Sequence, residues 1–168
     1  DVYKRQGDNV RDDELLFAPE RCGGIAAEQL VGLCFSGKYD RAGVMKLVRG
    51  RGGLLAHLGT SDAMEVERRM ARGDERARLV YDAMLYTAAK SIGAMAAAAG
   101  GDIDRIILTG GIAHSAYVAD YLTKKVRFIA PVEVMAGEFE MEALAAGAAR
   151  VLSGRETAHR FRDLARGE

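Results

Sequence analysis

The segment TGGIAHS, residues 109–115, combines residue types that suit a ligand site. Gly110 and Gly111 lack side chains, so a flat ring or a phosphate could touch the main chain there. The segment follows an apolar run and precedes an expected helix, whose first N–H groups can bind an anion. A strand–turn–helix of this kind places a ligand at the carboxyl end of a sheet. An ordinary strand-to-helix turn would use the same two glycines.

Arg21 is a second candidate, in the loop FAPERCGG at residues 17–24. Proline and two glycines break regular structure in this loop. The planar guanidinium matches phosphate oxygens through a fork of N–H donors, whereas the alternative is a solvated surface arginine. The neighbouring Cys22 has no histidine beside it in sequence to activate a thiolate.

An acidic cluster begins the helix expected at residues 140–152. Glu138, Glu140 and Glu142 either favour the helix dipole or supply oxygen ligands for Mg²⁺. His57 and His114 are far apart and lack the spacing of a metal site.

The segment GLCFSGKY, residues 32–39, matches a phosphate loop except at its last position. Tyr39 stands where Ser or Thr should hold Mg²⁺, and a helix rather than a strand is expected before it. Lys38 is therefore interpreted as a surface residue after a helix that ends near Gly37.

Periodicity and capping residues predict the elements that position these candidates. Asp40 is expected to cap a helix, Asp62 and Glu65 to form a capping box, and Gly100–Gly101 to end the longest helix. The longest helix should bury the face that carries Val80, Met84, Ala88, Ile92 and Met95, and the last helix should turn Leu144 and Ala148 inward. Helices are predicted at 28–35, 41–49, 62–70, 75–99, 115–124 and 140–152, a loop at 49–61, a strand buried on both faces at 105–109, and one or two short strands within 126–135.

Composition narrows the class of protein. The chain has 168 residues, 24 basic against 24 acidic side chains and 49% hydrophobic residues, which indicates a globular chain without a basic face for nucleic acid. Two cysteines favour a reduced, cytoplasmic setting, and no apolar run is long enough for a membrane span. Strands alternating with helices predict an α/β fold.

Five separated motifs together resemble the butyrate kinases of the acetokinase family. They are FAPERCGG, FSGKYD, GGLLAHLGTSDAMEVERR, ILTGGIAHS and FIAPVEVMAGEFEMEALAAGAARVL, in that order. The resemblance implies the C-terminal domain of the actin-like ATPase (ribonuclease H-like) fold, with a mixed sheet flanked by helices. It assigns residues 15–154 to this nucleotide-binding domain, 1–14 to foreign residues and a remnant of a preceding domain, and 155–168 to a polar tail.

The resemblance also implies a reaction and its residues: ATP and butanoate give ADP and butanoyl phosphate, with Mg²⁺. Arg21 would contact the transferring phosphoryl group, and Glu140, less surely Glu138, would lie near the metal. A homo-oligomer is expected. The nucleotide residues implied are Asp62, Gly110, Gly111, Ile112 and Ser115.

Several departures leave alternatives open. Cys22 replaces the family's usual Ser, Met64 its usual Arg, and Ala136 and Phe139 its Pro and Asp. These changes keep open a non-catalytic nucleotide-binding or oligomerisation module, and a kinase for branched acids or acetate is a further alternative. The family's N-terminal half is absent from the sequence, so the bare chain is expected to be inactive, because half a cleft cannot enclose a substrate.

Overall fold

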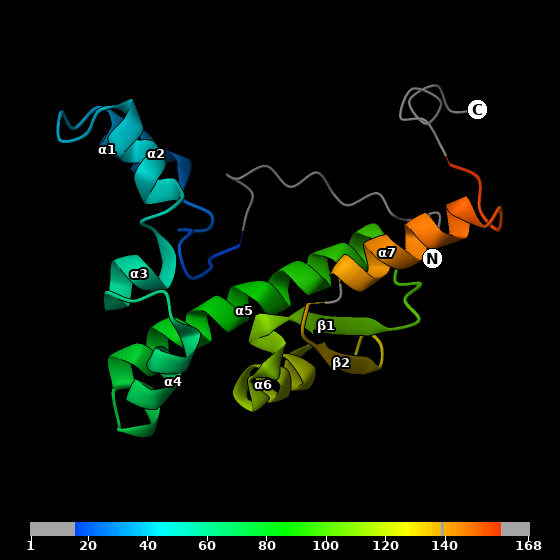
Figure 1. The fold of residues 1–168 in the computed structure, drawn as a ribbon. Coiled ribbons are helices and arrows are strands. Elements are labelled where there is room, and N and C mark those ends of the chain that lie inside the picture. Colours follow the sequence, from blue (N-terminus) through cyan, green and yellow to red (C-terminus); the bar gives the residue numbers. More distant parts are fainter. Residues whose placement is uncertain (1–15, 139, 159–168) are drawn as a thin grey trace.

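The computed structural model describes residues 16–138 and 140–158, and ten elements follow one another there. They are α1 (Ala27–Cys34), α2 (Arg41–Val48), α3 (Gly53–Leu58), α4 (Ala63–Ala71), α5 (Glu75–Ala98), β1 (Ile106–Gly110), the 3₁₀ helix η1 (Gly111–His114), α6 (Ala116–Val126), β2 (Val132–Ala136) and α7 (Glu140–Leu152). The long helix α5 runs through the molecule, with α3 and α4 at its first half and the sheet and α6 on one side (Figure 1). The helix α1 and its partner α2 form a pair at the periphery.

Local signals in the sequence predicted most helix boundaries. Asp40 accepts the Gly43 N–H at 2.7 Å at the start of α2, and Asp74 accepts the Ala77 N–H at 2.9 Å at the start of α5. Gly100 and Gly101 follow α5 in the left-handed region, as a helix end requires. The expected helices are therefore confirmed, with small shifts at their ends.

The hydrophobic core forms where α5 meets α3, α4 and α6. Its buried members are Leu54, Val66, Met70, Ala77, Tyr81, Met84, Leu85, Val118 and Leu122. The buried face of α5 differs from the predicted one, since Tyr81 and Leu85 are buried whereas Met95 is 48% exposed. The packing partners meet only the first half of α5, so the regular apolar spacing farther along faces outward.

The two strands form a parallel pair in which Ile106 lies opposite Val132 and Gly110 opposite Ala136. The expected burial of the first strand on both faces is wrong, because Ile107 is 54% exposed. Within the described residues the sheet has these two strands only, so it is parallel there rather than mixed.

Three further predictions need correction. The predicted loop at 49–61 contains α3, which forms because Leu54 is fully buried and Leu58 packs against the core. The capping box at Asp62 is half formed, since the Asp62 N–H donates to Thr60 instead of Glu65. Leu144 does not face inward but is 69% exposed.

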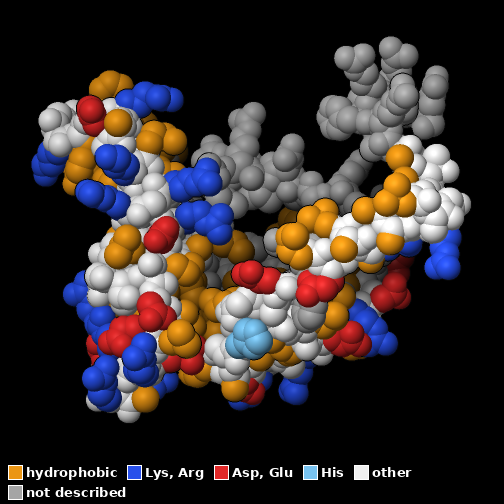
Figure 2. Space-filling model, viewed as in Figure 1, with side chains coloured by type: hydrophobic (Ala, Val, Ile, Leu, Met, Phe, Trp, Pro, Cys, Tyr) orange, Lys and Arg blue, Asp and Glu red, His pale blue; other side chains and the backbone are white. Residues whose placement is uncertain are grey.

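Hydrophobic side chains follow one another along the surface of α7 (Figure 2). Met141 and Leu152 are exposed there together with Leu144, and Ala148 is exposed too. Among the described residues, no helix combines the length and the apolar character that crossing a membrane requires.

A pair of glycines, Gly52–Gly53, lies at the start of α3 against the loop that carries Arg21. A Cβ at Gly52 would lie 2.5 Å from the Cys22 nitrogen, and one at Gly53 would lie 1.7 Å from the Ala18 oxygen. Gly53 also has a φ of +63°, which other residues rarely adopt. Any side chain at Gly53 therefore forces the two backbone segments apart.

We predict that Gly53→Ala lowers the free energy of unfolding by more than about 2 kcal/mol, because it combines backbone strain with a steric clash. The matched control is Gly93→Ala within α5, where an added Cβ meets nothing within 4 Å. The control should be neutral or stabilise by up to about 1 kcal/mol. Urea unfolding of the three proteins measures both effects, and equal stabilities would contradict the packing role of Gly53.

Candidate functional site

The turn that carries Arg21 is held by backbone hydrogen bonds to the segment between α2 and α3. The Ala18 N–H donates to the Arg21 carbonyl at 3.1 Å, which closes the turn. The Glu20 carbonyl accepts the Gly50 N–H at 2.8 Å and the Gly52 N–H at 3.2 Å. These bonds fix the backbone on both sides of Arg21.

The first N–H groups of α3 also bond to this turn. Leu54 donates to the Ala18 carbonyl at 3.3 Å and Leu55 donates to the Pro19 carbonyl at 3.0 Å. The first N–H groups of a helix need partners outside the helix, so the turn acts as the cap of α3. The helix and the Arg21 turn are therefore one packed unit.

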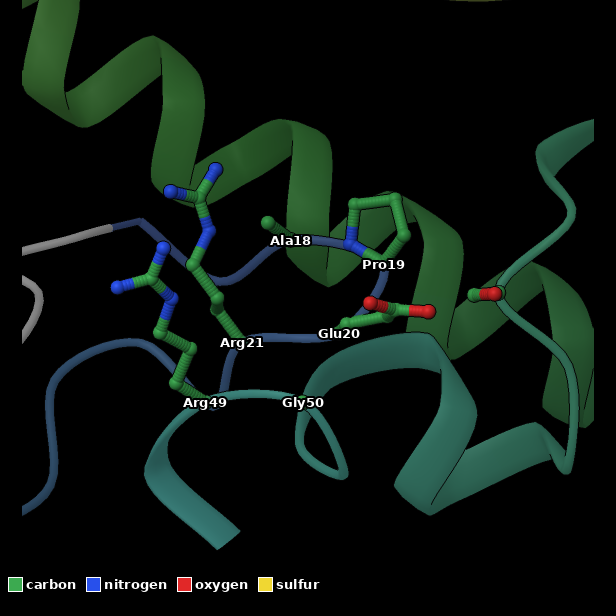
Figure 3. A pocket seen from close by; sticks show the side chains of 7 residues that line it. Ala18, Pro19, Glu20, Arg21, Arg49 and Gly50 are labelled. Carbon is green, nitrogen blue, oxygen red and sulfur yellow. The ribbon is translucent and has the colours of Figure 1, made fainter. Parts of the chain in front are cut away.

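A cavity of about 410 Å³ opens beside this unit (Figure 3). Ala18, Pro19, Glu20, Arg21, Arg49, Gly50 and Ser61 line it. Ser61 belongs to the segment GTSDAM, so the cavity brings together two of the segments that the sequence singled out.

Two arginines stand side by side on this cavity. Arg21 lies opposite Arg49 in an antiparallel bridge, and their side chains extend in the same direction (Figure 3). Among the residues that the structure describes, the Arg21 guanidinium makes no hydrogen bond or ion pair. Arg49 was not predicted from the sequence, since one arginine in RGRGG does not differ from its neighbour by type or by spacing.

Cys22 is half-buried beside Arg21. Its thiol donates to the Gly23 carbonyl at 3.1 Å, and burial raises the pKa of the thiol above its ordinary value. A raised pKa keeps the thiol protonated, which disfavours a nucleophilic role.

Asp62 begins α4 and its carboxylate already has partners. Its Oδ1 accepts the Met64 N–H at 2.9 Å, and its Oδ2 lies 3.6 Å from an Arg68 nitrogen. The side chain is 48% exposed, so it keeps acceptor capacity toward solvent. Met64 is 72% exposed at the same helix start.

The turn TGGIAHS has the expected strand–turn–helix form, with η1 between β1 and α6. Gly110 has a φ of +83°, whereas Gly111 does not need glycine's conformational freedom. A Cβ at either glycine would meet no atom within 4 Å, so the main chain is open there. Ile112 is 39% exposed on the same turn.

Ser115 ends this turn and is hydrogen-bonded on both sides. Its hydroxyl accepts the Val118 N–H at 3.1 Å, which caps α6, and donates to Glu67 Oε1 at 2.6 Å. The same Glu67 oxygen accepts the hydroxyl of fully buried Tyr81 at 2.9 Å. Burial, and then the bond to Glu67, raise the pKa of Tyr81. Glu67 thus joins α4 to the turn, a contact between residues 48 positions apart that no local pattern predicts.

The acidic cluster begins next to the same turn. Gly110 and Gly137 exchange backbone hydrogen bonds of 3.1 and 3.2 Å, so Glu138 follows directly after a residue paired with the turn. Glu140 is the first residue of α7, as predicted, and Phe139 lies outside the described residues. In the described part of the chain, no group of three or more His, Cys, Asp or Glu side chains is arranged to hold a metal ion.

The structure places Arg21 and the GTSDAM segment on one cavity, and links GTSDAM to TGGIAHS through α4 and Glu67. The residues of TGGIAHS do not line that cavity. GLCFSGKY spans the end of α1 and the turn after it, so the strand that a phosphate loop requires does not precede it.

Curated relatives share most of this sequence. The chain is 47% identical over 154 residues to butyrate kinase 2 of Clostridium acetobutylicum, covering 92% of this chain and 43% of that protein. It is 50% identical over 141 residues to a probable butyrate kinase 2 of Caldanaerobacter subterraneus subsp. tengcongensis, covering 84% of this chain and 40% of the relative. The chain thus spans less than half the length of these relatives.

Solved structures share the fold. The acetate kinase of Porphyromonas gingivalis superposes with a TM-score of 0.73 at 24% identity, over 82% of this chain and 41% of that one. The acetate kinase of Entamoeba histolytica gives 0.68 at 17% identity, over 79% and 42%. These likenesses confirm the expected α/β fold class. Residues 16–157 match the pattern that defines the acetokinase family, and the chain therefore belongs to that family.

Proposed function

We propose that this chain is part of a short-chain fatty acid kinase that transfers the terminal phosphoryl group of ATP to butanoate. The relatives named butyrate kinase, at 47% and 50% identity, are the observation that carries this proposal. The cavity beside Arg21 supports it, since it combines a held guanidinium with the GTSDAM segment.

The reaction asks the protein mainly for positioning and for compensation of charge. A carboxylate oxygen of butanoate attacks the terminal phosphorus of ATP, and the bond from that phosphorus to the ADP oxygen breaks. The carboxylate is already an anion, so no base is needed to activate it. Arg21 donates to the oxygens of the transferring group, where negative charge must be stabilised.

The nucleotide would lie against the open main chain of TGGIAHS. Gly110 and Gly111 offer bare backbone, and Ile112 offers a partly exposed apolar surface for a flat ring. Ser115 spends its hydroxyl proton on Glu67 and keeps one acceptor position, so its larger role is to shape the turn. Asp62 is at the start of the helix that Glu67 fixes to the turn.

Magnesium fits the chemistry of the acidic cluster, because carboxylate oxygens are the ligands that Mg²⁺ prefers. Glu138 is exposed directly after the Gly110–Gly137 pairing, and Glu140 begins α7 nearby in sequence. We propose Glu140, with Glu138 as its neighbour, to hold the ion. When bound, the ion would neutralise charge on the phosphate oxygens.

We predict that activity depends on the parts of the relatives that this chain lacks. A completed protein, in which the remaining part of a butyrate kinase relative is joined to this chain, should form acyl phosphate from ATP and butanoate. The 168-residue chain alone should form none, because it supplies one wall of a cleft. Trapping acyl phosphate with hydroxylamine across acids of two to five carbons measures both proteins and the preferred length. Turnover by the bare chain would contradict the prediction.

We predict that Arg21→Ala in the completed protein lowers kcat by about 10²–10³, with little change in nucleotide affinity. The guanidinium is expected to act on charge that develops in the transition state, so binding of the ground state should change less. Steady-state kinetics and calorimetry separate the two quantities. A kcat within about threefold of the parent would return Arg21 to the solvated alternative.

We predict that Gly111→Val in the completed protein weakens ATP and ADP alike, by more than about tenfold in Kd. Its φ is not in the left-handed region, so valine adds bulk without that strain. The matched control is Gly32→Val in α1, where an added Cβ also meets nothing within 4 Å. Calorimetry gives both affinities, and thermal melting checks folding. Unchanged affinities in a folded Gly111→Val protein would place the nucleotide elsewhere.

A further inference from the structure

The bridge between Arg21 and Arg49 determines where both guanidinium groups lie. Residues directly opposite each other in an antiparallel bridge carry their side chains on the same face, about 5 Å apart at Cβ. The flanking bonds, from the Cys22 N–H to the Val48 carbonyl at 3.1 Å and from Gly50 to Glu20 at 2.8 Å, hold this pairing. The two side chains consequently extend together along the cavity (Figure 3).

Arg49 owes this position to the end of α2. It is the residue at which the helix stops, and its backbone is extended with φ −141° and ψ 126°. An extended residue can pair with a neighbouring segment, whereas a helical one cannot. Arg51, two positions on, does not line the cavity and is exposed.

Two neighbouring cations repel each other, and an anion that contacts both offsets the repulsion. Glu20 also lines the cavity, but its side chain points away from the two guanidinium groups (Figure 3). Two planar forks of N–H donors on one wall match an anion with several oxygens.

We propose that Arg49 is the second guanidinium of a two-arginine site that binds a phosphoryl oxyanion together with Arg21. This inference rests on the proposed function, in which that anion is the transferring phosphoryl group. Arg21 and Arg49 then share the equatorial oxygens, and loss of either leaves the other bound to an incompletely compensated group.

The direct test is titration of the 168-residue chain with inorganic phosphate at constant ionic strength, followed through the arginine Nε–H resonances. Arg21→Lys, Arg49→Lys and Arg51→Lys assign the three signals. We expect the Arg21 and Arg49 signals to shift together with one Kd, while the Arg51 signal stays still. An Arg49 signal that does not move, whether or not Arg21 moves, overturns the proposal.

Kinetics of the completed protein provide the second test. Arg49→Ala should lower kcat by on the order of 10², and Arg49→Lys should lose less, because it keeps the charge without the fork. Arg51→Ala is the matched control and should stay within about twofold. The double variant Arg21→Ala/Arg49→Ala should lose far less than the product of the single losses, since both act on one anion.

The outcomes separate this inference from the proposed function. If Arg21→Ala lowers kcat while Arg49→Ala matches Arg51→Ala, the kinase proposal stands and the second arginine is wrong. If the completed protein transfers no phosphoryl group, the kinase proposal fails, and the phosphate titration still decides whether Arg49 binds an oxyanion. Thermal melting confirms that each variant is folded before either comparison is made.

Discussion

The close contact between Gly52–Gly53 and the Ala18–Cys22 turn is the constraint on which the anion site depends. Side chains at these glycines would lie 2.5 Å and 1.7 Å from backbone atoms of the turn. Their absence lets the Glu20 carbonyl accept two N–H groups and lets α3 use the turn as its cap. Leu54 in turn anchors α3 in the core, so the position of Arg21 follows from burial far from its own side chain.

Glu67 has the corresponding position for the nucleotide segments. One carboxylate oxygen accepts from buried Tyr81 on α5 and from Ser115 at the end of TGGIAHS. Breaking such a shared bond leaves a buried hydroxyl without its partner, which costs more than an average hydrogen bond contributes. The helix α4, which starts at Asp62, is thereby fixed relative to the open glycine turn.

What the sequence could predict was local. Caps such as Asp40 and the glycines after α5 act within a few residues, so the pattern predicted them correctly. Arg49 and Glu67 acquire their positions from segments distant in the chain, which a single sequence does not reveal. The same reason explains α3, since a short apolar run between glycines becomes a helix only where a core receives Leu54.

The two Gly-Gly pairs illustrate why composition alone cannot assign a site. Gly52–Gly53 is bare because protein backbone fills the space, whereas Gly110–Gly111 is bare with nothing within 4 Å of an added Cβ. The first pair makes the Arg21 turn rigid, and the second leaves main chain open for a ligand. Phosphoryl transfer benefits from both properties, because donors that are fixed before the substrate arrives need not reorganise as charge develops. The close-packed pair and the open pair therefore fit complementary parts of one proposed site.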